Sequence, residues 1–567
     1  MSKYAIGLDF GTNSCRSLIV DISNGSELST HVFNYPSGES GVILDSRDPN
    51  LARQNPFDYL QGIEVTINEA ITKAKASDKN FSSDNIIGIG VDTTGSSPMP
   101  VDADGTPLCF LDKFKTNPSA MVWLWKDHTS HTEANQITQL ASKEHPEYLS
   151  KIGGVYSSEW FWSKILHCSK EDSEVFKSAH SFVEICDWIP AVLVGDTKPE
   201  NLKRSVCASG HKAMYNEQWG GLPDSTFFQK LSPELGELRD KINDKAHSAE
   251  ERVGFLSDEW ADKLGLSTNV SVAVGAFDAH MGAVGAGIKT GTLIKILGTS
   301  TCDVMVAPNK KKLADIPGVC GIVNGSVMDG YFGIEAGQSA VGDIFLWFIN
   351  NLVPEKYGKT QDEKFKNLEE AATKIKPGET GLLALDWNNG NRTILVDVRL
   401  AGLLLGQTLH TQPQEIYRAL IEATAFGALA IIDRIEENDV PIKEVINCGG
   451  LAVKSPLIMQ IYADVMGRPM KISKSEQTPA LGAAIFGAVS AGKDVSGFDN
   501  VEHAQKVITG ISKAYEPDEK NHLVYKKLYK LYKQLHDGFG TKTWNGNMFN
   551  VMKDLLNIRD EVRKEKQ

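Results

Sequence analysis

The chain opens with two apolar segments separated by a short polar turn. Residues 5–8 and 17–20 have the composition of strands, and the turn 11–14 between them reads Gly-Thr-Asn-Ser. The pattern returns near the middle of the chain, where the strand-like region 293–306 contains a Gly-Thr-Ser-Thr turn at 298–301. The sequence therefore predicts two similar hairpins, about half a chain length apart.

A second pair of apolar segments supports the similarity of the two halves. Residues 86–92 and 444–450 read as strands and follow the two hairpins in the same order. One short match could arise by chance, whereas two matches in one order favour an ancient duplication. We therefore predict an α/β protein with two related domains, 1–288 and 289–567, that face each other. Because no low-complexity linker separates them, we expect a hinge between the domains.

Helical periodicity is clearest in the second half. Residues 415–435 have apolar positions at helical spacing and many alanines, which predicts a buried helix packed against a sheet. Residues 523–535 predict an amphipathic helix with lysines on its outer face, as part of a C-terminal helical extension. The basic end, residues 559–567, is interpreted as a solvated, fraying tail.

Composition and charge narrow the class of protein. The 567 residues include 59 Lys and Arg against 72 Asp and Glu, and this net charge of −13 argues against nucleic acid or an anionic membrane as a partner. No run approaches 18 apolar residues, and Asp9 lies where a signal peptide needs its apolar core. The eight scattered cysteines indicate neither a disulfide framework nor a zinc site. We expect a cytoplasmic protein of enzyme size, and this interpretation allows a homo-oligomer.

The first polar turn is rich in groups that can bind an anion. Its backbone N–H groups and side chains are donors suited to phosphate. The candidate residues are Thr12, Asn13, Ser14 and Arg16. Asp9 lies just before the turn, at a place suited to a hydrated Mg²⁺. Ordinary β-turns also prefer these residue types, so one such hairpin indicates little by itself.

The second turn strengthens the phosphate hypothesis. Gly298, Thr299 and Ser300 offer a similar set of donors in the other half of the chain. Two related hairpins, one in each domain, could hold a triphosphate from opposite sides. The pair therefore favours a nucleotide site between the domains.

Several motifs together resemble the FGGY carbohydrate kinases, which belong to the actin, hexokinase and Hsp70 ATPase superfamily. They are Gly-Leu-Asp-Phe-Gly-Thr at 7–12, Gly-Thr-Ser-Thr at 298–301 and Cys-Gly-Gly at 448–450. Further stretches resemble the family members that phosphorylate L-ribulose in arabinose catabolism, and they lie at 90–98, 124–128, 156–167, 209–212, 275–287 and 335–340. Two departures leave the finer substrate choice open. Gln407 replaces an aliphatic residue of the family's second signature, and the first signature is poorly kept at 157–170.

The resemblance implies two ribonuclease H-like, actin-like ATPase domains with a catalytic cleft between them. It implies ATP and Mg²⁺ as cofactors and transfer of a phosphoryl group to L-ribulose, giving L-ribulose 5-phosphate. A kinase for another ketose or polyol, such as D-ribulose, xylulose or glycerol, is the nearest alternative. An ATP-gated chaperone or scaffold of the same superfamily is an alternative from another class.

Asp278 matches the catalytic base of the family. Its neighbours Phe277 and Met281 should partly desolvate the carboxylate and raise its pKa toward a useful value. Asp278 could also cap the helix expected to begin near Ala279. His280 is interpreted as a structural, hydrogen-bonded histidine in preference to a metal ligand or base.

Three residues match sugar-binding positions of the family. Lys212 would donate hydrogen bonds to the sugar, Glu335 would accept them, and the small Ser96 would leave room. Without the motif context, a lone Lys or Glu would be interpreted as a solvated surface charge.

Three further residues match positions that contact adenosine. They are Gly342, Gly450 and Lys454, and a Gly-Gly pair before a helix would let the nucleoside lie against the backbone. An ordinary strand-to-helix turn would explain the same glycines.

Overall fold

The computed structural model describes residues 2–310 and 312–564 and contains two seven-stranded sheets. In the first sheet, β6, β1 and β2 are neighbours, with β1 and β2 antiparallel and β1 and β6 parallel. The strands are β1 (Tyr4–Phe10), β2 (Ser14–Asp21), β3 (Ser26–Asn34), β6 (Ile86–Thr93), β12 (Arg252–Phe255), β13 (Ser271–Ala273) and β14 (Ala276–Phe277). The predicted first hairpin is therefore confirmed.

The second sheet repeats this arrangement. The predicted second hairpin is the antiparallel pair β15 and β16, and β21 lies parallel to β15 as β6 lies parallel to β1. The strands are β15 (Thr292–Leu297), β16 (Thr301–Pro308), β17 (Gly321–Asn324), β18 (Tyr331–Ala336), β21 (Glu444–Cys448), β22 (Met470–Ser473) and β23 (Ile511–Tyr515). The shared pairing supports the predicted relation between the halves.

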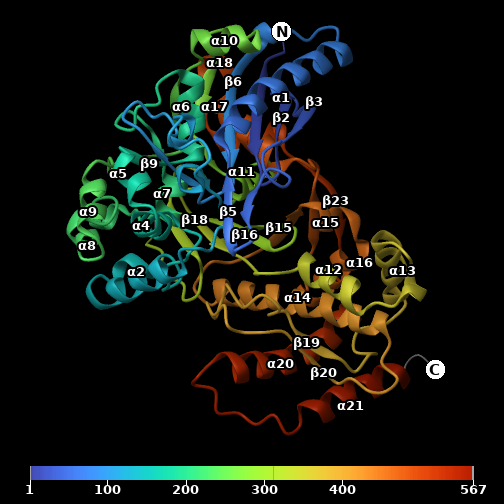
Figure 1. Cartoon of the computed structure of the whole chain (residues 1–567). Coiled ribbons are helices and arrows are strands. Elements are labelled where there is room, and N and C mark those ends of the chain that lie inside the picture. Colours follow the sequence, from blue (N-terminus) through green and yellow to red (C-terminus); the bar gives the residue numbers. More distant parts are fainter. Residues whose placement is uncertain (1, 311, 565–567) are drawn as a thin grey trace.

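Two helices rich in small residues pack between the sheets. Helix α11 (Asp278–Gly285) lies against α17 (Thr478–Ser490), and α17 also packs on β1 and β6 of the first sheet, where Figure 1 shows it beside β6. The approach is so close that a Cβ on Gly90 would lie 1.8 Å from the carbonyl oxygen of Ala483. This packing places the first residue of α11 at the junction of the two halves.

Helices surround each sheet. Helix α1 (Pro56–Ser77) packs on β2 and β3, and a largely helical insertion with its own apolar core forms one side of the first half (Figure 1). The helices of this insertion include α2 (His131–Glu144), α4 (Phe161–Glu171), α8 (Ser225–Gln229) and α9 (Pro233–Asp240). Helix α7 (Val206–Lys212) packs against β14 and β17. The second half is built around α12 (Gly342–Leu352), α13 (Gln361–Thr373), α14 (Pro413–Glu436), α16 (Pro456–Met466) and α20 (Glu519–Gly540).

The helix predictions in the second half are confirmed, but the prediction for the basic end is wrong. Helices α14 and α20 contain the expected segments. Residues 559–564 belong to α21 (Val551–Lys564), which packs against α20 through apolar positions at helical spacing, including Ile558 and Val562. The many charged residues of this segment make its periodicity hard to recognise in the sequence. Residues 565–567 of the predicted tail lie outside the described residues. Among the described residues, no helix combines the length and apolarity needed to cross a membrane.

Candidate active site

A cleft of about 310 Å³ lies between the two sheets, at the ends of both hairpins and the start of α11. It brings together many of the predicted residues, which come from both halves of the chain. The predicted residues that line it are Thr12, Lys212, Asp278, Gly298, Thr299, Ser300 and Glu335. The structure therefore assembles the candidate base, both turns and two candidate sugar contacts around one space.

Asp278 is the first residue of α11 and faces this cleft. The backbone N–H of Ala279 donates a hydrogen bond of 2.6 Å to its Oδ1 atom. Burial, followed by the negative charge of Asp9, raises the pKa of Asp278 to about 7. The expected effect of desolvation is confirmed, and the carboxylate can accept a proton near neutral pH.

Asp9 and Asp92 lie opposite each other on the parallel strands β1 and β6. The Asp9 carboxylate is 3.4 Å from Arg16 Nε, which opposes the rise in pKa that burial causes in Asp9. Asp92 is fully buried, and burial and the charges of Asp9 and Asp278 raise its pKa well above the ordinary value. Asp92 was not predicted as a site residue, although its place at the end of the strand beside β1 could have indicated it.

Fewer side chains of the first turn line the cleft than expected. Thr12 lines the cleft, and its Oγ1 atom accepts a 3.0 Å hydrogen bond from Nε1 of Trp125, another lining residue. Asn13 is exposed and donates to the carbonyl oxygen of Ser40, while Ser14 begins β2. In this structure, neither Asn13 nor Ser14 lines the cleft.

Lys212 and Glu335 form an ion pair of 2.9 Å across the two halves. Each residue is 7% exposed, which excludes the interpretation as solvated surface charges. Burial alone would raise the pKa of Glu335, but the Lys212 ammonium and two neighbouring histidines lower it well below the ordinary value. Glu335 is therefore an anion at neutral pH.

Ser96 is buried and does not line the cleft. The Ser96 hydroxyl donates to Glu184, and its backbone carbonyl accepts a 2.8 Å hydrogen bond from Lys164 Nζ. The adjacent Gly95 lines the cleft instead. Because the Ser96 hydroxyl already donates its proton to Glu184, it cannot donate that proton to a ligand.

The three candidate adenosine residues lie around the end of β15. The N–H of Gly342 donates to the carbonyl oxygen of Gly298 at 3.1 Å, so the start of α12 contacts the second turn. Gly450 begins the short helix α15 (Gly450–Lys454), and a Cβ on the preceding Gly449 would lie 2.4 Å from the carbonyl oxygen of Leu297. A Cβ on Gly450 would meet no atom within 4 Å, and Lys454 is exposed at the end of α15.

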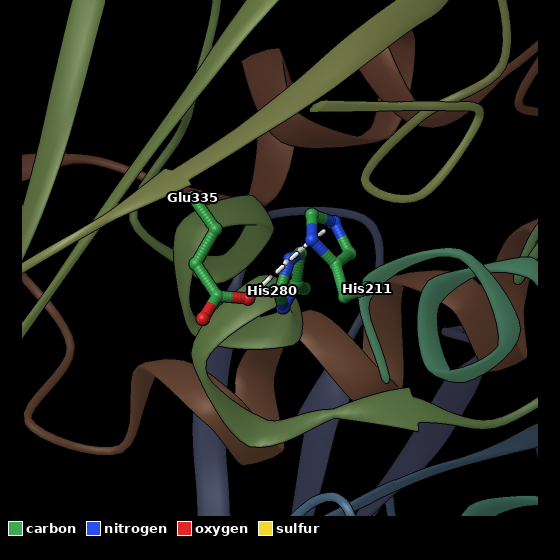
Figure 2. Close-up of side chains that lie close together, drawn as sticks. All are labelled: His211, His280 and Glu335. Atoms are coloured by element: carbon green, nitrogen blue, oxygen red, sulfur yellow. Dashed lines mark hydrogen bonds and ion pairs between the residues drawn. The ribbon is translucent and has the colours of Figure 1, made fainter. Parts of the chain in front are cut away.

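Two buried histidines lie beside Glu335 (Figure 2). Nε2 of His280 is 3.1 Å from Nε2 of His211, which confirms His280 as a hydrogen-bonded histidine. His211 was not predicted as a site residue, although it lies in the stretch 209–212 that resembles the family.

Arg392 also lines the cleft and was not predicted. Its Nη2 atom donates a 2.6 Å hydrogen bond to the carbonyl oxygen of Thr301, next to the second turn. Arg392 lies in an irregular segment where neither periodicity nor a motif singles it out.

The fold and the cleft define a two-domain α/β sugar kinase, and the comparisons with known proteins identify the family. Residues 4–285 and 293–491 match the N-terminal and C-terminal domains of the FGGY family of carbohydrate kinases. This chain belongs to that family.

The curated relatives point to a narrower group. A ribulokinase of Halalkalibacterium halodurans is 42% identical to this chain over 550 residues, which are 95% of both chains. A ribulokinase of Geobacillus thermodenitrificans is 40% identical over 100% of this chain and 99% of its own.

Solved structures of more distant sugar kinases share the fold. A xylulose kinase from Rhodospirillum rubrum is 18% identical, with a TM-score of 0.76 over 95% of this chain and 99% of its own. A Plasmodium falciparum glycerol kinase with ADP is 16% identical, with a TM-score of 0.74 over 94% of this chain and 98% of its own.

Proposed function

We propose that this protein is an ATP-dependent kinase that phosphorylates O5 of L-ribulose, giving L-ribulose 5-phosphate and ADP in L-arabinose catabolism. The observation that carries the proposal is Asp278, a partly buried carboxylate with a pKa of about 7, in a cleft that both Gly-Thr turns line. Full-length relatives named ribulokinase support the choice of sugar. ATP as the phosphoryl donor supports a cytoplasmic location.

In this proposal, Asp278 accepts the proton of the attacking O5 hydroxyl. The turns at 11–14 and 298–301 hold the phosphates from opposite sides, with Thr12 and Thr299 donating through their hydroxyls. Positioning and charge neutralisation supply most of the acceleration in phosphoryl transfer, and the base contributes a smaller part. Closure of the cleft would exclude water, which would otherwise compete with the sugar for ATP.

The residues present fit a magnesium ion near the first turn. Carboxylate oxygens are the ligands that Mg²⁺ prefers, and the Asp9 and Asp92 carboxyl groups lie on adjacent strands beside Asp278. Asp9 would hold the ion through its hydration shell. When bound, Mg²⁺ neutralises charge on the β- and γ-phosphates.

Sugar and nucleoside would contact different parts of the chain. Lys212 would donate to hydroxyl oxygens of the ketopentose, and Glu335 would accept from its hydroxyl groups. Ser96 would contribute through its small size, which leaves room for the sugar. Gly342, Gly450 and Lys454 would contact adenosine. This division means that changes at the sugar residues should leave ATP binding intact.

A sugar-dependent ADP-release assay tests the proposal. We expect the purified protein to turn over L-ribulose with a higher kcat/KM than D-ribulose, D-xylulose or glycerol. A preference for glycerol or D-xylulose would overturn the choice of sugar, and ADP release without dependence on any sugar would overturn the kinase proposal.

A further inference from the structure

Three buried side chains from distant parts of the chain converge beside the cleft (Figure 2). His211 comes from α7, His280 from α11 and Glu335 from β18. Oε2 of Glu335 lies 3.5 Å from Nδ1 of His211 and 3.7 Å from Nε2 of His280. The cluster therefore contains two imidazoles and one carboxylate, supplied by both halves of the molecule.

The hydrogen bonds around His211 accommodate a tautomer with the proton on Nε2 and Nδ1 free to bind a metal ion. The Ser326 hydroxyl donates to the carbonyl oxygen of Val323 at 3.2 Å, so Ser326 Oγ is free to accept from Nε2–H of His211 at 3.0 Å. With the proton on Nε2, Nδ1 of His211 presents a lone pair to Glu335. The Nδ1 atom has no hydrogen-bond partner within the described chain.

The same assignment fixes the tautomer of His280. Its Nε2 atom lies 3.1 Å from the protonated Nε2 of His211, so in this assignment it carries no proton, because two N–H groups would repel at that distance. The proton of His280 then lies on Nδ1, and the unprotonated Nε2 atom is 3.7 Å from Oε2 of Glu335. In this assignment Nδ1 of His211, Nε2 of His280 and one carboxylate oxygen of Glu335 are unprotonated ligand atoms, and these atoms lie within 4.8 Å of one another.

We propose that His211, His280 and Glu335 form a binding site for a divalent transition-metal ion of the zinc class. Tetrahedral bonds of about 2.1 Å separate neighbouring ligand atoms by about 3.4 Å, close to the two separations from Glu335 Oε2. Two histidines and one carboxylate are a known zinc ligand set that leaves one position open. Imidazole ligands disfavour Mg²⁺, so this site is distinct from the one near Asp9.

The surroundings of the cluster suit such an ion. Ser326 accepts from the ring nitrogen of His211 that would not bind the metal, and Lys212 binds the other carboxylate oxygen of Glu335. Outer partners of this kind orient metal ligands. Because His280 and Glu335 line the cleft, a bound ion would hold the carboxylate and oppose sugar binding.

Cobalt titration of the full-length protein, after chelator treatment and without sugar or nucleotide, tests the site directly. We expect one equivalent of Co²⁺ to bind with visible d–d absorption, and Zn²⁺ to displace it. His211→Gln and His280→Gln should each weaken binding at least tenfold. Ser326→Ala, which keeps all three ligands, should weaken it by about 10–100-fold. His503→Gln is the matched control, since His503 pairs with Asp499 on the surface.

Absence of d–d absorption at 100-fold excess Co²⁺ over protein would overturn the proposal. Equal affinity in His211→Gln and His503→Gln would also overturn it. Circular dichroism verifies the fold of each variant. If both ligand variants unfold, Ser326→Ala decides, because unchanged affinity there would contradict the assigned tautomer and the site. Since no reaction is measured, the result does not depend on which sugar the enzyme uses.

Discussion

The ammonium group of Lys212 lies 2.9 Å from Oε1 of Glu335, and this buried pair joins the two halves of the molecule at the cleft. Lys212 ends α7 and Glu335 lies on β18, so the pair forms only when both halves are in place. Removing one partner of a buried pair leaves an uncompensated charge. The pair therefore affects both sugar binding and stability, and experiments must separate the two effects.

Lys212→Met and Glu335→Gln test the role of the pair in sugar binding. Loss of a charge-assisted hydrogen bond should lower kcat/KM for L-ribulose by roughly 10- to 150-fold, corresponding to about 1.5–3 kcal/mol. The KM for ATP should stay within a few-fold, as steady-state kinetics with each substrate varied will show. Lys263→Met, which breaks an exposed pair with Glu259, should change neither value.

Thermal unfolding separates the structural effect of these changes. Each single variant should lower Tm, whereas the double variant should recover part of the loss because no unpaired charge remains. Impaired ATP binding in proportion to sugar binding would contradict the assignment of the pair to the sugar.

Thr12→Val and Thr299→Val test the two turns as a phosphate cradle. The Thr12 oxygen already accepts from Trp125, so its proton is free to donate to a phosphate. Losing one such donor should weaken ATP binding by about 1–3 kcal/mol in either variant. Calorimetric titration with ATP and, separately, with L-ribulose measures the effect, and Thr72→Val on the exposed face of α1 is the control. An effect from one turn alone would argue against a shared cradle.

The raised pKa of Asp278 predicts a pH dependence of catalysis. Only the deprotonated carboxylate can accept the O5 proton, and the pKa is about 7. The value of kcat/KM should therefore fall about tenfold per pH unit below 7 and level off above it. The residual kcat/KM of Asp278→Asn should not show this fall below pH 7. An unchanged pH profile in that variant would assign the titration to another group, such as Asp92.

Close packing of α17 on the first sheet predicts an effect on stability. A Cβ on Gly90 would lie 1.8 Å from the carbonyl oxygen of Ala483, so Gly90→Ala must displace α17. We expect a loss of about 1–3 kcal/mol in the free energy of unfolding, measured by urea denaturation. Gly510→Ala, whose new Cβ meets only the Lys474 side chain at 3.4 Å, should cost less than half as much. Equal losses would contradict the packing argument.

The fold was largely predictable because its main signals are local. Each hairpin is an apolar segment, a polar turn and a second apolar segment. Asp278 lies in a motif whose residues are continuous in the sequence. Helix α21 escaped prediction because Arg559, Asp560 and other charged residues surround its apolar positions.

The unpredicted parts of the site depend on long-range contacts. Asp92 gains its raised pKa from Asp9 and Asp278, which are distant in sequence. The pairing of His211 with His280 likewise depends on how α7 meets α11. Ser96 turns toward Glu184, a partner that no local pattern indicates.

The central claim is that Asp278 acts as the base in a cleft that the two halves build together, and single-turnover kinetics of Asp278→Asn test it most directly. Binding of ATP and L-ribulose, measured by calorimetry, should stay within a few-fold of the unaltered protein, while the rate of phosphoryl transfer should fall by roughly 10²–10⁴-fold. Asp258→Asn is the control, because Asp258 is also the first residue of a helix, α10 (Asp258–Leu264), but is exposed. Near-normal phosphoryl transfer by folded Asp278→Asn would contradict the account.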